Sequence, residues 1–130
     1  MAKNLNVVNL LDFYGAMLTD KQQEVAHLYF DEDLSLSEIA GRLGITRQGV
    51  RDHIKKVEDA VFSLEKRLCV AANYAKMQLR CRQIKEVIDS LSQYNQKYLF
   101  SAELTKRLKL ISELMEKMLE EQAGQSGEQR

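Results

Sequence analysis

The stretch LSEIAGRLGITRQGVRDHIKKVE, residues 36–58, decides the fold because it contains two helix signals with one break between them. Ser35 and Glu38 have the spacing of a capping box, which predicts that a short helix begins there. Gly44 follows where a helix commonly ends on a residue in the left-handed conformation. Thr46 can then cap a second helix. Two helices joined by so short a turn predict a helix-turn-helix.

Both helices carry small or apolar residues on the side that would face the other helix. These inward positions are Ala40, Ile45, Val50 and Ile54. Ala40 is small where the two helices must approach closely, and Ile45 fills the turn. A helical hairpin of another kind can also place a glycine between two capped helices. The joint occurrence of these four residues with Gly44 favours the helix-turn-helix.

The outward face of the second helix carries positive charge. Arg47, Arg51 and Lys55 recur every four residues, so they share one face of a helix. In a recognition helix, Arg and Gln at the first turn reach base edges, and later Lys and Arg reach phosphates. Nucleic-acid contacts are therefore predicted at Thr46, Arg47, Gln48, Arg51 and Lys55. The alternative is a solvated surface, because Asp52 and the acidic segment 31–33 dilute the positive charge.

The composition predicts an all-α protein of the cytoplasm. Proline is absent and glycine occurs 6 times in 130 residues, so few residues interrupt long helices. Lys plus Arg and Asp plus Glu number 19 each. No global positive field therefore attracts nucleic acid or an anionic membrane, and any such contact must be local. We expect no signal peptide and no membrane-spanning helix, since no run of about 18 apolar residues occurs.

Residues of the types that catalyse reactions or bind metals are isolated in the sequence. Cys69 and Cys81 form no C-x-x-C pair, and His27 and His53 belong to no H-E-x-x-H motif. His27 precedes Asp31 by four residues, which predicts a pair on a helix surface. The sequence also lacks a glycine-rich phosphate loop and a G-x-S-x-G nucleophile motif. We therefore expect a protein that is not an enzyme, with no metal site and no cofactor.

Apolar spacing extends the helical organisation on both sides of the motif. Residues 6–16 carry an apolar stripe, and Thr19 with Gln22 forms a second capping box that opens a helix to about Phe30. The helix after Thr46 should continue to about Leu68, because its apolar stripe continues that far.

Two more long helices are predicted after residue 68. Their apolar stripes are Tyr74, Met77, Cys81, Ile84, Ile88 and Leu91, and then Leu104, Leu108, Ile111, Met115 and Met118, with Ser101 as a cap. Further apolar residues widen this surface, so each helix needs at least two neighbours, from the same chain or from a second copy. They are Leu79, Val87, Leu110, Leu114 and Leu119. A homodimer is favoured. The expected organisation is a helix-turn-helix domain at 1–68, a C-terminal segment for dimerisation or packing at 69–122, and a disordered tail at 123–130.

Residues 18–68, LTDKQQEVAHLYFDEDLSLSEIAGRLGITRQGVRDHIKKVEDAVFSLEKRL, resemble the fourth region of bacterial sigma factors. With the leading segment VVNLLDFYGAMLTDKQ and the helical C-terminal half, residues 5–120 resemble the bacterial YlxM family more closely. That resemblance implies a DNA-binding type of helix-turn-helix regulator. It also implies a link to the signal recognition particle pathway, through genetic neighbourhood with the particle's GTPases. The family often has Tyr-Asp-Asn where this chain has Arg51-Asp52-His53, so no role is borrowed for Arg51.

Three functions follow from these observations. The first, which the resemblance favours, is a regulatory accessory of the signal recognition particle that acts on its RNA or its GTPase. The second is a dimeric DNA-binding transcription regulator, whose two recognition helices would meet half-sites about 34 to 36 Å apart. The neutral net charge counts against it. The third is a helical protein-interaction module with a vestigial helix-turn-helix, which Asp52 and the acidic segment 31–33 favour.

Overall fold

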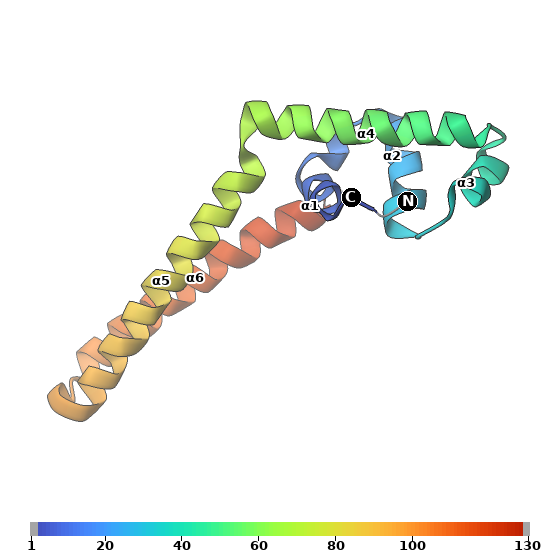
Figure 1. The fold of residues 1–130 in the computed structure, drawn as a ribbon. Coiled ribbons are helices and arrows are strands. Elements are labelled where there is room, and N and C mark those ends of the chain that lie inside the picture. The colour runs from blue at the N-terminus through green and yellow to red at the C-terminus, as the bar shows by residue number, and fades with distance from the viewer. Residues whose placement is uncertain (1–2, 129–130) are drawn as a thin grey trace. The chain divides into compact units, whose positions relative to one another are not determined.

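The computed structural model describes the backbone of residues 3–128 and the side chains of residues 3–121. All regular structure in this described part is helical, which confirms the predicted all-α class (Figure 1). Contacts between residues divide the chain into two units. The first unit ends at Ala71, and the second runs from Ala72 to Glu128. Within the described residues, no helix has both the length and the hydropathy that crossing a membrane requires.

The first unit consists of four α-helices with two short irregular turns. In chain order these are α1 (Leu5–Tyr14), the 3₁₀ turn η1 (Gly15–Met17), α2 (Asp20–Ala26), the π turn η2 (His27–Asp31), α3 (Leu36–Leu43) and α4 (Arg47–Leu68). Both predicted capping boxes are present. The Thr19 hydroxyl accepts from the Gln22 N–H at 3.2 Å, and the Ser35 hydroxyl accepts from the Glu38 N–H at 3.1 Å. Each helix therefore begins at the residue that its sequence predicts.

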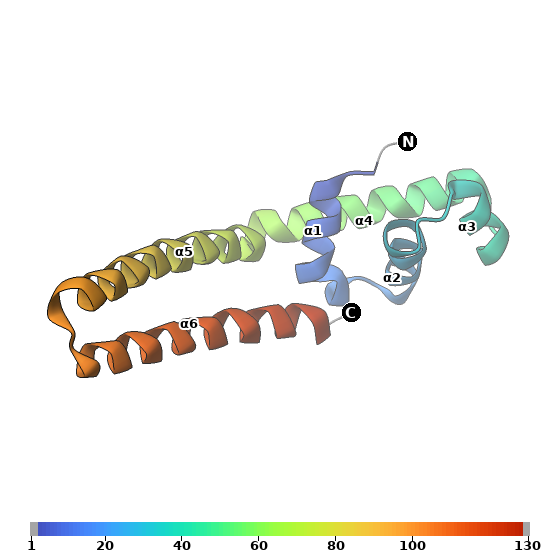
Figure 2. The same cartoon turned by 90° about the horizontal axis from the view of Figure 1, so that it is seen from below.

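Helix α4 supplies residues to both apolar clusters of the first unit. Val50 and Ile54, in its first half, pack with buried residues of α2, η2 and α3, among them Ile39 and Ala40. Val57 and Val61, in its second half, pack with the buried face of α1, which lies across α4 in Figure 2. Deep burial of four residues at helical spacing holds α4 in place along its length. The opposite face of α4 is left in solvent.

The second unit is an antiparallel helical hairpin, in which α5 (Val70–Tyr94) and α6 (Ala102–Glu128) lie side by side (Figure 1, Figure 2). A π turn, η3 (Asn95–Leu99), leads out of α5. Ser101 caps α6 as predicted, since its hydroxyl accepts from the Leu104 N–H at 3.1 Å. Helix α6 is described to Glu128, and the disordered tail at 123–130 stays a prediction. Residues 129–130 lie outside the described residues.

The hairpin buries only one of the apolar stripes that its sequence contains. Cys81, Ile88 and Leu108 are buried, but Ile84 and Leu91, which belong to the same predicted stripe, are 50% and 41% exposed. The physical reason is that two helices cover a single seam of each other, so the neighbouring stripe has no partner within the hairpin.

Candidate nucleic-acid interface

The turn between α3 and α4 has the geometry of a helix-turn-helix. Gly44 adopts a left-handed conformation with φ 67° and ψ 34°, as predicted. The N–H groups of Gly44 and Ile45 both donate to the Ala40 carbonyl oxygen, the second at 3.1 Å. Ile45 packs against the cluster that α3 and α4 share. The Thr46 hydroxyl accepts from the Gly49 N–H at 3.0 Å, so α4 begins directly after the turn.

Three of the predicted contact residues form an exposed cationic surface, which we call the α4 basic face: Arg47, Arg51 and Lys55. The four-residue spacing places these side chains on successive turns of one helix face. Within the described residues, none of the three makes an ion pair or a hydrogen bond with another side chain. Their charges are therefore free to meet an external anion.

The other two predicted contact residues are partly used inside the protein. The Gln48 side-chain amide donates to Asp52 Oδ1 at 3.0 Å, so one of its two amide hydrogens is occupied. The Thr46 hydroxyl accepts the cap bond to Gly49 and keeps its own hydrogen for a further acceptor. Both residues are exposed on the surface beside the α4 basic face. Asp52 is the one carboxylate among residues 47–56, and it receives the Gln48 bond.

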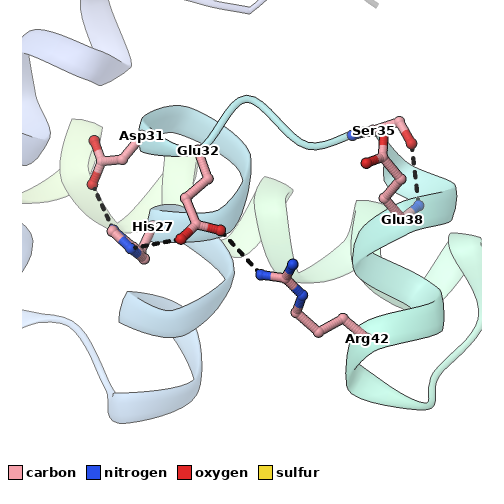
Figure 3. A network of polar contacts seen from close by, with 6 residues as sticks. All are labelled: His27, Asp31, Glu32, Ser35, Glu38 and Arg42. Atoms are coloured by element: carbon pink, nitrogen blue, oxygen red, sulfur yellow. Dashed lines mark hydrogen bonds and ion pairs between the residues drawn. The ribbon is translucent and has the colours of Figure 1, made fainter.

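On the other side of the motif, Arg42 of α3 belongs to a network of polar contacts. Glu32 lies between His27 and Arg42 in Figure 3. Glu32 Oε2 accepts from Arg42 Nη1 at 3.1 Å, and Glu32 Oε1 lies 3.5 Å from His27 Nε2. The predicted pair of His27 with Asp31 is also present, with 3.0 Å between Nδ1 and Oδ2. Arg42 is thus paired within the motif, in contrast to the three cations of α4.

Sequence reasoning missed Arg42 as a candidate contact. It lies in the last turn of α3, the first helix of the motif, and this helix crosses the nucleic-acid backbone in helix-turn-helix complexes. Its position in the first helix of the motif is a sequence signal for a backbone contact. Its ion pair with Glu32 joins residues ten positions apart, so helical spacing does not predict that pair. In the part of the chain that the structure describes, no cluster of three His, Cys, Asp or Glu side chains could hold a metal ion.

Comparison with known proteins agrees with this geometry. A family model described as "Putative helix-turn-helix protein, YlxM / p13 like" matches residues 1–89. The chain belongs to the UPF0122 family. The match covers the whole first unit, including the α3 and α4 motif, and continues into α5.

Individual UPF0122 proteins match both units. The UPF0122 protein of Desulforamulus reducens is 34% identical over 119 residues, which are 91% of this chain and 95% of the relative. That of Acetivibrio thermocellus is 36% identical over 120 residues, 92% of this chain and 99% of the relative. That of Caldanaerobacter subterraneus subsp. tengcongensis is 44% identical over 79 residues, 61% of this chain and 68% of the relative.

Proposed function

We propose that this UPF0122 protein is a non-enzymatic, cytoplasmic regulatory protein that binds nucleic acid through α4, as an accessory of the signal recognition particle. The observation that carries the proposal is the α4 basic face, whose three cations are exposed and unpaired within the described residues. The face lies on the second helix of a helix-turn-helix, which is the helix that enters the major groove in complexes of this motif.

Arg47 supports the proposal because helix stability does not account for it. It is the first residue of α4, and the first turn of this helix contains no acidic residue. A cation at a helix N-terminus opposes the helix dipole by about 0.3 to 1 kcal/mol. A phosphate at the same position would interact favourably with both the Arg47 guanidinium and the helix N-terminus.

The choice of the signal recognition particle follows from the family resemblance, with its RNA or its GTPase as the partner. A second candidate is a dimeric DNA-binding transcription regulator, for which a homodimer would supply two copies of α4. A third is a protein-interaction module, and the exposed apolar residues of α5 and α6 favour it. In all three readings we propose that the acting form is a homodimer.

Binding measurements with three labelled probes distinguish the candidates. The probes are signal recognition particle RNA, a random-sequence DNA duplex and the particle's GTPase, each titrated with protein at low salt. The proposal expects the RNA to bind most tightly and the double variant Arg47→Ala/Arg51→Ala to weaken that binding. Stronger binding of the duplex would favour the transcription regulator. Binding of the GTPase alone, unchanged in the double variant, would contradict the nucleic-acid interface.

A further inference from the structure

Helix α5 carries a second apolar seam beside the one that it buries against α6. This seam consists of Ile84, Val87, Leu91 and Tyr94, whose spacing of three and four residues is that of the contact positions in a coiled coil. All four are between 41% and 67% exposed. Such a seam packs against a further helix, and α6 already occupies the other side of α5.

Helix α6 repeats this arrangement. Ile111, Leu114 and Met118 have the same spacing and are between 40% and 57% exposed. They lie beside the α6 residue that is buried in the hairpin, Leu108. Each helix of the hairpin therefore has one seam that is covered and one that is open.

The two open seams lie on the same face of the hairpin. Ile84 follows the buried Cys81 by three residues, and Ile111 follows the buried Leu108 by three. Three residues of an α-helix turn by about 300°, so each open seam is rotated by about 60° in the same sense from the buried one. Because α5 and α6 are antiparallel, equal rotations bring both seams to one side. We call these seven residues the apolar face of the hairpin.

Charged residues border this face but do not interrupt its two segments. Arg80 and Arg107, both exposed, lie four residues before Ile84 and Ile111, at the start of each seam. Among residues 84–94 and 111–118, helical spacing places every charged side chain on other sides of the two helices. These charged residues are Lys85, Glu86, Asp89, Glu113, Glu116 and Lys117. A cavity of about 540 Å³ lies between the two helices on the other side, and its lining is mixed: Arg82 and Glu120 are charged, and Cys81 and Met115 are apolar. Within these two segments the open seams are therefore apolar.

We propose that the apolar face is covered by the same face of a second copy of the chain, which forms a four-helix bundle from two hairpins. The seven side chains expose roughly 500 to 600 Å², and a standard interface removes about 800 Å² from each partner, so flanking residues supply the rest. A two-fold contact would place the apolar seams of one copy on those of the other. Among the described side chains of the second unit, only three apolar ones are buried, namely Cys81, Ile88 and Leu108, and a bundle would give both helices a full core.

A second copy of the chain is also a partner that is always present. An apolar patch of several hundred Å² left in water favours aggregation, so its partner must be present whenever the protein is. A second copy meets that condition at any level of expression. The assignment deepens the homodimer of the proposed function, and it does not depend on nucleic-acid binding.

Sedimentation equilibrium without nucleic acid tests the assignment. The full chain should have twice its 15.0 kDa mass. The variant Val87→Lys/Leu114→Lys, changed at two exposed positions of the face, should sediment as a monomer that keeps its helical circular dichroism. The matched control is Gln93→Lys/Ala102→Lys, since both residues are exposed and helical spacing places them on the side of the hairpin away from the face. This control should remain a dimer.

A measurement without substitutions covers the case in which the face variant fails to fold. The thermal midpoint of the unchanged protein should rise with protein concentration, as it does when folding is linked to association. A mass of 15.0 kDa for the unchanged protein, a midpoint independent of concentration, or equal dissociation of the control would overturn the proposal. A dimer that binds no nucleic acid would contradict the proposed nucleic-acid interface and leave this inference standing. A monomer that binds nucleic acid would overturn this inference and the proposed homodimer, and leave the nucleic-acid interface standing.

Discussion

The Tyr14 hydroxyl donates a 2.6 Å hydrogen bond to Glu65 Oε1, which joins the last residue of α1 to the last turn of α4. The same hydroxyl accepts from the Val70 N–H at 3.0 Å, and Glu65 Oε1 also accepts from the Ala71 N–H at 3.0 Å. Cys69, between these partners, adopts a left-handed conformation with φ 55°. Side chains of α1 and α4 therefore satisfy the first N–H groups of α5.

The first prediction concerns the stability of this junction. Tyr14→Phe should lower the free energy of unfolding of the first unit by about 1 to 3 kcal/mol, because it removes a bond to a carboxylate and leaves the Val70 N–H without its acceptor. Urea denaturation followed by circular dichroism measures the change. Tyr29→Phe is the control, since Tyr29 is also buried and its hydroxyl makes no hydrogen bond within the described residues. Equal losses in the two variants would contradict a special role for Tyr14.

The pH dependence of the same junction gives a second prediction. Burial, together with the hydrogen bond to Glu65, raises the pKa of Tyr14 above its ordinary value of 10.0. The unfolded chain then loses this proton at lower pH than the folded chain, so the stabilisation is complete below pH 10 and is lost as the pH rises through the folded pKa. The stability difference between the unchanged protein and Tyr14→Phe should stay constant from neutral pH to about 9 and decrease above about 10. A difference that grows above that pH would contradict the assignment.

The third prediction tests the turn of the motif. Gly44→Val should destabilise the protein by about 1 to 3 kcal/mol, because Gly44 has a φ of 67° and β-branched residues are strained there. A Cβ at this position would meet no atom within 4 Å, so the cost comes from the backbone and not from a clash. Gly44→Asn is the control, since asparagine tolerates this conformation. Urea denaturation should show a smaller loss of unfolding free energy for Gly44→Asn than for Gly44→Val. Equal losses would show that the left-handed conformation is not the cause.

The fourth prediction concerns the connection of the hairpin. Asn95 is 2% exposed, and its amide donates to the Ser101 carbonyl oxygen and to Thr105 Oγ1 while its Oδ1 accepts from the Ser101 N–H. Asn95→Ala should destabilise the hairpin by about 1 to 3 kcal/mol, because the Ser101 N–H, the Ser101 carbonyl oxygen and Thr105 Oγ1 lose their bonds to this buried side chain. Amide hydrogen exchange should accelerate around residues 95–105 and stay unchanged in α3. Gln96→Ala, at the exposed neighbouring position, should have little effect.

The fifth prediction concerns the charge of the motif. Glu32→Gln removes the carboxylate that pairs with Arg42, and the pair is exposed enough that the stability should change by less than about 1 kcal/mol. Nucleic-acid affinity should rise, because Arg42 becomes free to contact a phosphate. Fluorescence anisotropy measures this gain. Glu24→Gln removes the same charge from α2, away from the motif, and should have a smaller effect; equal gains would indicate only a general charge effect.

Much of the fold follows from short-range sequence signals. The capping residues Thr19, Ser35, Thr46 and Ser101 and the left-handed Gly44 act within a few residues, so spacing alone predicts them. The bond between Tyr14 and Glu65 joins residues 51 positions apart, and no local pattern indicates it. Asn95 organises the connection before Ser101 through bonds over six and ten residues, which no helical spacing indicates.

Periodicity also leaves open which of two adjacent apolar stripes is covered. Ile84 and Ile88 both fit a helical stripe, yet Ile84 is half exposed and Ile88 is buried, because burial depends on where α6 packs. In the candidate site, the spacing of Arg47, Arg51 and Lys55 was sufficient to predict a common exposed face. The bond between Gln48 and Asp52 has the same four-residue spacing, but sequence alone does not say which of several possible partners Gln48 takes.

Salt dependence of nucleic-acid binding tests the central claim most directly. If the three cations of the α4 basic face meet phosphates of a duplex, log affinity should fall with log salt with a slope of about −2 to −3 per protomer, and somewhat less on single-stranded RNA. Arg47→Ala/Arg51→Ala should weaken binding and reduce the slope by about 2 on a duplex, with little change in the thermal midpoint. Lys66→Ala/Arg67→Ala removes two exposed cations from the last turn of the same helix and should leave the slope unchanged. Unchanged affinity and slope in the Arg47/Arg51 variant would contradict the account and show that the α4 basic face is a solvated surface.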